Sequence, residues 1–353
     1  MLLEAEKKGG DGDDGGKWKS SWSFFEKEPS ESQGGILNKE VGRVRIAVVG
    51  LGGVGGYYGG KLARHCLNRE DREVIFIARG DHLKAIQKNG LQQITVEGTF
   101  TAIPHLATDD PTGVGVFDLV LFCVKAYDLE ESAKMLKNNI SEQTVAVTLL
   151  NGVDHAERLK ELLPKARVLN GCVYIGAYRV SPGVVRQVGG SCKLFFGPED
   201  GRCKEARWVE AVLREAGIQA EYREDIKTVV WEKYLFISPV ANATTYLGKT
   251  FGELLRSEES MKLLDGLLDE LERVARDQGV RLPQEIHRMS LERISSFPPE
   301  TKSSMQLDFE RGAKTELDAL TGYVVRYARD HGMAVPTYGE VYEWLLRRGE
   351  TRE

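Results

Sequence analysis

The stretch RVRIAVVGLGGVGGYYGGKLARHC (residues 43–66) decides the fold of this chain. Its run Ile46–Val49 is apolar, rich in β-branched residues and followed by a glycine, which is typical of a buried parallel strand. The segment Gly50-Leu51-Gly52-Gly53-Val54-Gly55 comes next, and a helix is expected from Gly53 to His65. In such a segment the first glycine permits a tight turn, the second lets a pyrophosphate approach the backbone, and the third lets helix and strand pack closely. The stretch therefore predicts a dinucleotide site of the Rossmann type, the alternative being a glycine-rich packing turn.

Strand and helix patterns alternate beyond this stretch. Buried strands are predicted at Glu73–Ala78, Phe117–Val124 and Thr144–Leu150, with a helix after each of them. This alternation predicts a doubly wound parallel sheet. After about Asp225 the strand patterns stop, and the periodicity becomes helical, including one long helix from about Ser304 to Asp330.

The predicted fold class is therefore α/β, with an N-terminal Rossmann-type doubly wound parallel sheet followed by an all-helical C-terminal domain. The expected domains are an NADP-binding domain over residues 44–224 and a helical substrate domain over residues 225–349. Residues 1–43 are rich in Gly, Asp, Lys and Ser and are predicted to be a disordered extension, because such a segment buries too little surface to offset its ordering entropy.

Composition excludes several classes of protein. The net charge of −5 gives no support to a nucleic-acid partner. The five cysteines form no Cys-x-x-Cys pair and the histidines lack ligand spacing, so neither a disulfide framework nor a metal site is predicted. No apolar run is long enough to span a membrane and no signal peptide is recognised, which leads us to expect a cytoplasmic protein.

The end of the second strand indicates which dinucleotide binds. A site for NAD usually places an acidic residue there, to bind the ribose 2′-hydroxyl. Here the strand ends in Arg79, whose planar guanidinium suits a 2′-phosphate, so NADPH/NADP+ is the predicted cofactor. The alternative is that Arg79 is an ordinary solvated arginine.

Two later strand ends carry polar residues at the edge where ligands bind in such folds. Lys125 follows FDLVLFCV, and Asn151 follows VAVTLL. Each alone could be a solvated strand end or a turn. Their occurrence at the same predicted edge favours a functional role.

Motifs in both halves of the chain resemble the ketopantoate reductase family (the 2-dehydropantoate 2-reductases), over roughly residues 44–348. In the first half the resemblance rests on GLGGVGGYYGGKLAR, ARGDHL, Val124-Lys125 and Asn151–Val153. In the second half it rests on Trp231–Lys233, Gly252–Leu254, Ser303–Asp308, Thr315–Leu317 and His331–Pro336. The resemblance implies NADPH-dependent reduction of a 2-keto acid to a 2-hydroxy acid, above all ketopantoate to pantoate in pantothenate and coenzyme A synthesis. No membrane or nucleic-acid partner is expected.

The resemblance also implies roles for individual residues. It makes Lys233 and Glu316 catalytic, with Glu316 also near the cofactor. It assigns the substrate to Ser304, Asn151, Asn242 and Thr301, and the cofactor to Gly50–Gly55, Arg79, Lys125 and Asn151. From pattern alone Lys233 could be a surface lysine beside an apolar stretch, Glu316 a solvated helix carboxylate, and Ser304 a helix cap.

Four positions depart from the family pattern. Asparagines are expected where this chain has Ile237, Ala241, Phe251 and Thr301. Asn242 lies one residue beyond Ala241, which turns it by about 100° on a helix. Since buried hydrogen-bonding groups dominate discrimination between polar substrates, a relative that reduces a different 2-keto acid stays open. So does a non-catalytic NADPH-binding sensor. A homodimer through the helical domain is plausible.

Overall fold

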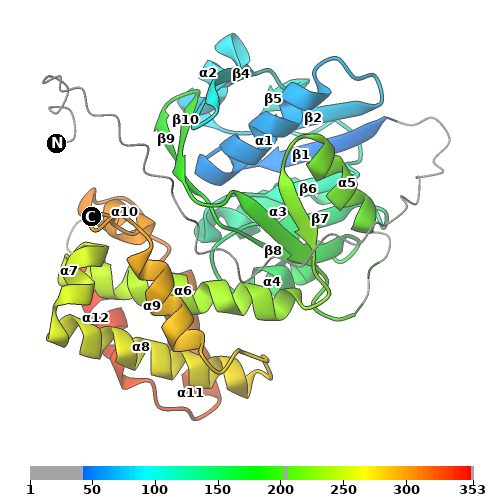
Figure 1. The fold of residues 1–353 in the computed structure, drawn as a ribbon. Coiled ribbons are helices and arrows are strands. Elements are labelled where there is room, and N and C mark those ends of the chain that lie inside the picture. The colour runs from blue at the N-terminus through cyan, green and yellow to red at the C-terminus, as the bar shows by residue number, and fades with distance from the viewer. Residues whose placement is uncertain (1–42, 202, 204–205, 351–353) are drawn as a thin grey trace, which may run out of the picture. The chain divides into compact units, whose positions relative to one another are not determined.

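The structure is a computed structural model that describes residues 43–201, 203 and 206–350. The predicted disordered extension lies outside the described residues, apart from Arg43. Figure 1 shows the element order: strands and helices are interspersed up to β12, and helices follow from α6 onward. The predicted fold class is confirmed.

An eight-stranded sheet forms the centre of the first half. Strand β1 (Val44–Val49) pairs in parallel with β2 (Arg72–Ile77) and with β6 (Leu119–Phe122). The order is β12-β11-β8-β7-β6-β1-β2-β5, and the only antiparallel pair among these described strands joins β11 to β8. The remaining strands are β5 (Leu106–Thr108), β7 (Val145–Thr148), β8 (Arg167–Val173), β11 (Lys193–Gly197) and β12 (Gln219–Tyr222).

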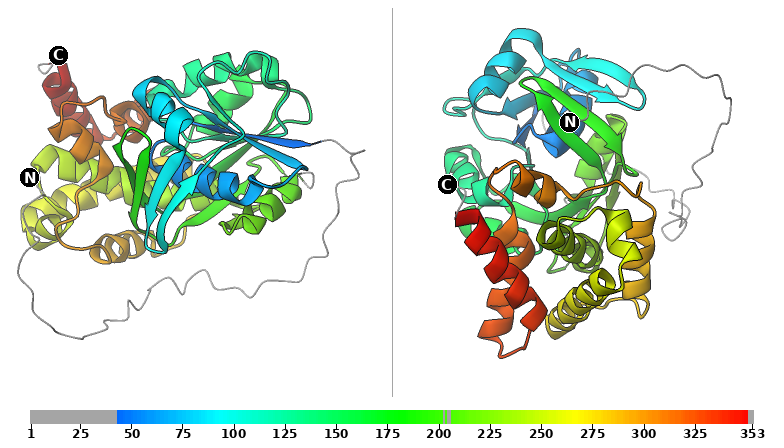
Figure 2. Two further views of the ribbon diagram at one scale, coloured as in Figure 1. Left: turned by 90° about the horizontal axis from the view of Figure 1, so that it is seen from above. Right: turned by 90° about the vertical axis from the view of Figure 1, so that its left-hand side faces the viewer.

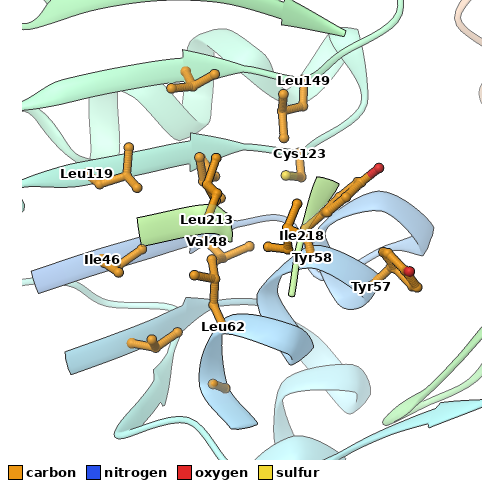
Figure 3. Close-up of a cluster of buried hydrophobic side chains, with 14 of the residues drawn as sticks. Ile46, Val48, Tyr57, Tyr58, Leu62, Leu119, Cys123, Leu149, Leu213 and Ile218 are labelled. Atoms are coloured by element: carbon orange, nitrogen blue, oxygen red, sulfur yellow. The ribbon is translucent and has the colours of Figure 1, made fainter. Parts of the chain in front are cut away.

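Both faces of this sheet are covered by helices. Successive side chains of a strand point to opposite faces, so Ile46 and Val48 join one buried cluster while Ala47 and Val49 join another. Figure 3 shows the first cluster, in which β1 packs against Leu62. Burying each of the larger side chains, such as Ile46, Val48 and Val49, contributes about 1.5–3 kcal/mol. The covering helices are α1 (Gly53–Cys66), α2 (Gly80–Asn89), α3 (Leu129–Met135), α4 (His155–Leu162) and α5 (Arg207–Glu215).

A second, four-stranded sheet lies against α1, with the order β4-β3-β10-β9. The sequence predicts short strands in this region, at Gln93–Val96, Phe100–His105 and Val184–Val188, but not a separate sheet, because pairing between strands that are distant in sequence leaves no local pattern. The glycines of α1 make this contact possible: a Cβ at Gly53 would lie 2.0 Å from the carbonyl oxygen of Ala177 in β9. The strands are β3 (Leu91–Thr95), β4 (Gly98–Ala102), β9 (Gly176–Ser181) and β10 (Val184–Gly189).

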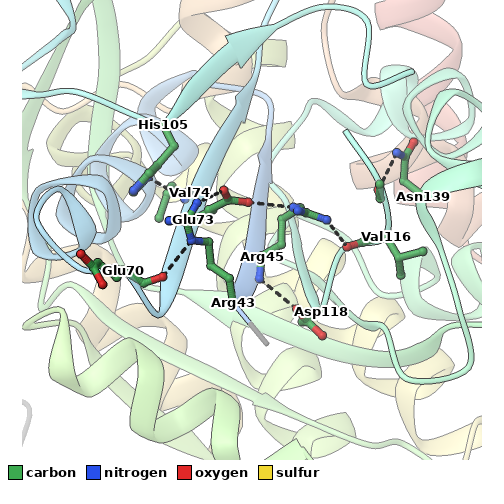
Figure 4. A network of polar contacts seen from close by, with 10 residues as sticks. Arg43, Arg45, Glu70, Glu73, Val74, His105, Val116, Asp118 and Asn139 are labelled. Atoms are coloured by element: carbon green, nitrogen blue, oxygen red, sulfur yellow. Dashed lines mark hydrogen bonds and ion pairs between the residues drawn. The ribbon is translucent and has the colours of Figure 1, made fainter. Parts of the chain in front are cut away.

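A polar network joins strands at the amino end of the large sheet. The backbone N–H of Arg45 donates to Asp118, and its guanidinium donates to Glu73, both over 2.9 Å (Figure 4). His105 accepts from the backbone of Val74 over 3.1 Å. These charges lie at the edge opposite the carboxyl ends of the strands, so they stabilise the sheet away from any ligand at those ends.

The second half is built around helix α6 (Ile226–Leu247). Most of its 22 residues are buried, because other helices and strand β8 pack around it. Figure 2 shows these helices from two further directions. They are α7 (Phe251–Arg256), α8 (Glu258–Asp277), α9 (Ile286–Ser295), α10 (Ser304–Glu310), α11 (Tyr323–Asp330) and α12 (Pro336–Glu350). Among the described residues, no helix combines the length and apolarity that a membrane span requires.

The predicted long helix from Ser304 to Asp330 is wrong. Helix α10 ends at Glu310, and Gly312 adopts a left-handed φ of +66°. The backbone N–H of Ala313 donates to the carbonyl of Asp308 and that of Gly312 to Phe309, which is the Schellman pattern of a helix end. The chain becomes helical again in a π-helical turn, η5 (Asp318–Gly322), that leads into α11.

Candidate active site

The glycine-rich turn has the geometry that a pyrophosphate requires. Gly50 adopts φ +87°, and a Cβ there would lie 2.7 Å from the side chain of Val124. A Cβ at Gly55 would lie 1.9 Å from the carbonyl oxygen of Gly50, so only glycine lets α1 pack this closely on β1. At Gly52 a Cβ would meet nothing within 4 Å. The turn therefore leaves open space beside the N-terminus of α1, where an anion is stabilised by backbone amides and the helix dipole.

Arg79 lies just beyond the carboxyl end of β2, in the N-cap position of α2. Its side chain is 67% exposed and pairs with Asp128 at 2.9 Å and with Glu131 at 3.6 Å. The hydrogen bond to Asp128, more than any other contact, raises the pKa of Arg79. The guanidinium is accessible, but a phosphate would have to compete with these two carboxylates.

Lys125 links the sheet to the helical domain through two carboxylates. Its ammonium lies 2.9 Å from Asp308 of α10 and 3.2 Å from the buried Glu316. The other oxygen of Glu316 accepts from the backbone N–H of Ala126 over 3.3 Å. Burial alone would lower the pKa of Lys125, but the two carboxylates outweigh it and raise this pKa. Asp308 is not among the residues that the sequence predicts for the site, although it ends the Ser303–Asp308 motif.

Lys233 is buried on α6 and donates a 2.8 Å hydrogen bond to the side-chain oxygen of Asn151. Asn151 directly follows Leu150 at the carboxyl end of the β7 strand region. Burial, above all other causes, lowers the pKa of Lys233. A buried ammonium whose charge is disfavoured is a stronger proton donor than a solvated one.

A narrow pocket surrounds this lysine. Its lining is mostly apolar: Leu150, Asn151, Gly152, Cys172, Val230, Lys233, Tyr234 and Ile237. Burial raises the pKa of the Cys172 thiol to about 11, so the thiol stays neutral beside the lysine at neutral pH. Sequence reasoning missed Cys172 because it lies within an apolar strand, although that strand ends at the same edge as β7.

Ser304 is the first residue of α10 and is exposed, whereas the side chain of Ser303 caps the helix by accepting from the backbone of Gln306 over 3.1 Å. Ser303 also contacts Thr244 of α6 at 2.9 Å. Thr301 accepts a hydrogen bond from the backbone of Phe251 over 2.9 Å, through its own backbone carbonyl. The structure thus places Ser304 and Thr301 near the end of α6 that follows Lys233 in sequence.

Asn242 does not line the pocket around Lys233. It is fully buried, its amide group donates to the carbonyls of Ser238 (2.9 Å) and Leu320 (3.2 Å), and its oxygen accepts from Thr321 (2.6 Å). The expected rotation of about 100° away from Ala241 therefore turns this side chain toward the π-helical turn. We leave Asn242 out of the proposed substrate site, because its hydrogen-bonding groups are used within the helical domain.

Comparison with known proteins assigns the family. Residues 46–201 match the family model "Ketopantoate reductase PanE/ApbA", and residues 225–348 match the model of its C-terminal part. The chain belongs to the ketopantoate reductase family.

Relatives of this family match over nearly their whole length. The chain is 31% identical to the uncharacterized oxidoreductase YkpB of Bacillus subtilis, over 85% of this chain and 97% of that protein. It is 31% identical to a 2-dehydropantoate 2-reductase of Halobacterium salinarum, over 83% and 95% of the two chains. A ketopantoate reductase of this family from Ralstonia eutropha superposes with a TM-score of 0.80 at 30% identity, over 88% and 99%.

A D-mandelate dehydrogenase in complex with NADH and anilino(oxo)acetate superposes with a TM-score of 0.78, over 88% and 99% of the two chains. At 22% identity, this likeness concerns the fold alone. Membership of the ketopantoate reductase family makes the protein an oxidoreductase that acts on CH–OH groups. Among the described residues, no group of His, Cys, Asp and Glu side chains could hold a metal ion.

Proposed function

We propose that this ketopantoate reductase family member reduces a 2-keto acid to a 2-hydroxy acid with NADPH, and that Lys233 donates the proton. The observation that carries the proposal is the buried Lys233 ammonium, hydrogen-bonded to Asn151 at the carboxyl edge of the sheet. This edge also carries the glycine-rich turn and Lys125.

The proposed roles follow from charge and position. When bound, the reduced nicotinamide supplies a hydride to the keto carbon. Lys233 gives its proton to the carbonyl oxygen as negative charge develops there, which yields the hydroxyl group. Glu316 orients the hydroxyl from its place beside Lys125, and Ser304 binds the substrate carboxylate at the first turn of α10. Asn151 holds the lysine and would lie near the nicotinamide of a bound cofactor.

The substrate that we propose first is ketopantoate, which would place the enzyme in pantothenate and coenzyme A synthesis. The second candidate is a 2-keto acid with an apolar side chain. It is favoured by Ile237, which lines the lysine pocket, and by the apolar Ala241 one turn further along α6. An apolar wall gives no partner to the hydroxyl group of ketopantoate, whereas it favours a branched or aromatic side chain.

Absorbance at 340 nm tests both candidates. NADPH oxidation would be measured with ketopantoate, 2-ketoisovalerate and phenylglyoxylate, beside a Lys233→Ala variant. We expect turnover with at least one of them and a loss of about 100-fold or more in kcat in the variant, because a general acid contributes this much. Full turnover in Lys233→Ala would refute the lysine assignment. Tight NADPH binding without turnover on any keto acid would favour the non-catalytic sensor instead.

NADPH rather than NADH is proposed on the accessible guanidinium of Arg79 at the carboxyl end of β2. An Arg79→Ala variant should raise the Kd for NADPH about 10-fold to 100-fold, since a charge-assisted hydrogen bond contributes about 1.5–3 kcal/mol. The Kd for NADH should change little. Asp128→Asn, which removes a competing carboxylate, should tighten NADPH binding; equal effects of Arg79→Ala on both cofactors would contradict the preference.

A further inference from the structure

Helix α6 presents two neighbouring rows of side chains to different surroundings. Lys233 and Ile237 lie in one row and line the lysine pocket, which Tyr234 of the next row also borders. Tyr234, Ser238 and Asn242 lie in the next row, each four residues apart, so they share one side of the helix. This second row contacts the π-helical turn η5 (Asp318–Gly322).

The contacts between this row and η5 are hydrogen bonds in a fully buried setting. The hydroxyl of Tyr234 donates to the carbonyl of Ala319 over 2.8 Å, and that of Ser238 donates to the carbonyl of Leu320 over 2.5 Å. Thr321 donates to the side-chain oxygen of Asn242 over 2.6 Å. The side chains of Ser238, Asn242 and Thr321 have no exposed surface.

Such a network is costly to leave incomplete, because a buried polar group without a partner loses its hydrogen bonds to water. A π-helical turn is wider than an α-helical turn and is rare. Aliphatic side chains in place of Ser238, Asn242 and Thr321 would pack between α6 and η5 equally well. Packing alone therefore does not explain why these side chains are polar. They are explained if the turn has to be held in one conformation.

Glu316 is the residue that this turn holds. It lies two residues before η5, and its backbone carbonyl accepts the hydrogen bond from the N–H of Leu320 over 3.0 Å. Its side chain reaches Lys125 at 3.2 Å and the N–H of Ala126 at 3.3 Å. A change in the turn would move this carboxylate relative to both groups.

We propose that Ser238, Asn242 and Thr321 are positioning residues, which fix the π-helical turn and thereby place the Glu316 carboxylate beside Lys125 and the backbone of Ala126. The inference rests on the proposed function insofar as Glu316 takes part in the reaction. It also explains why α6 carries an asparagine at position 242, which faces away from the row of Lys233.

Thr321→Val tests the proposal because it removes one hydroxyl with almost no change in shape. We expect kcat/KM to fall about threefold to tenfold, the usual effect of losing one neutral hydrogen bond. Thr321→Ser retains the hydroxyl and should restore most of the activity. Thr245→Val is the matched control. Thr245 is buried on α6, and among the described residues its hydroxyl donates only to the carbonyl of Ala241.

A double-mutant cycle separates positioning from general stability. If Thr321 acts through Glu316, Thr321→Val should lower kcat/KM far less in a Glu316→Gln background than in the wild type. Purely structural damage would lower kcat/KM by the same factor in both backgrounds, which would overturn the proposal. Thermal unfolding of Thr321→Val and Thr245→Val should show similar losses of stability.

Hydrogen exchange gives a readout that needs no turnover. The backbone N–H of Ala126 donates to Glu316, so Thr321→Val should speed its exchange, whereas Thr245→Val should not. Unchanged exchange at Ala126 would overturn the proposal even in an active enzyme. If no 2-keto acid were reduced by the wild type, the proposed function would fail, and faster exchange at Ala126 would still support the positioning role.

Discussion

Lys233 carries a charge that its surroundings disfavour. It is buried on α6, and Asn151 is its hydrogen-bond partner. Its ordinary pKa of 10.5 is lowered, first of all by burial. Because only the protonated amine can donate, kcat/KM should fall as pH rises through this lowered pKa, well before a solvated lysine would lose its proton. A pH profile of kcat/KM with an alkaline limb at or above 10.5 would contradict the role of Lys233.

The same burial predicts a stability gain on removing the charge. The unfolded chain binds the Lys233 proton more tightly than the folded chain does. The free-energy cost of burying the charged lysine is therefore present in full below its lowered pKa and disappears as pH rises toward 10.5. Lys233→Met should therefore raise the free energy of unfolding at pH 7 by about 1–2 kcal/mol while abolishing turnover. Thermal melts at pH 7 and pH 10.5 check this: the gain should shrink at the higher pH, and a loss at pH 7 would refute it.

Sequence patterns predict the site least completely at the level of single residues. The family resemblance implies roles for Lys233 and Glu316, and the strand ends point to Lys125, but the ion pairs of Lys125 with Asp308 and Glu316 join positions about 190 residues apart, and no local pattern encodes them. Asn242 shows the opposite problem. Its type suggests a substrate contact, whereas its place one residue beyond Ala241 turns it by about 100° on the helix, and in the structure it bonds to Thr321.

At the scale of elements, the β1–α1 turn gives a matched pair of glycine variants. A Cβ at Gly55 would lie 1.9 Å from the backbone oxygen of Gly50, so Gly55→Ala should destabilise the protein by about 3 kcal/mol. Gly52 has a negative φ of −71° and open space around it, so Gly52→Ala should fold normally. It should instead weaken NADPH binding at least about 10-fold, because the methyl group occupies the space proposed for the pyrophosphate.

Denaturant unfolding and fluorescence titration of NADPH distinguish these two effects. A Gly52→Ala protein that unfolds like the wild type and binds NADPH equally well would show that the pyrophosphate lies elsewhere. A Gly55→Ala protein of wild-type stability would mean that α1 can move away from β1, contrary to the close packing described above.

Elements were largely predictable where periodicity was strong. The buried strands predicted over Glu73–Ala78, Phe117–Val124 and Thr144–Leu150 and the helices after them are present in that order, because buried parallel strands and amphipathic helices each leave a local pattern. The predicted helix from Ser304 to Asp330 is wrong because the helical pattern continues across Gly312, whose left-handed φ ends α10. Gly312 stands at the position where a helix end prefers glycine, so the sequence does carry a signal for this end.

At the scale of the whole molecule, the resemblance predicted the order of a Rossmann-type sheet and a helical domain, and the family match confirms it. The second sheet was missed, because it pairs β3 in parallel with β10, strands about 90 residues apart in sequence. The boundary near Asp225 and the homodimer stay predictions. Light scattering after gel filtration would test the dimer.

The two rows of α6 have a consequence for how such a protein can change over evolutionary time. Residues that line the lysine pocket, such as Ile237, stand on a different side of the helix from Ser238 and Asn242, which hold the π-helical turn. A substitution in the first row can therefore alter which side chain the pocket accepts without loosening the turn. Under the proposed function, residues that line the pocket can change while the residues that hold the π-helical turn stay the same. Substrate specificity can then change by single substitutions.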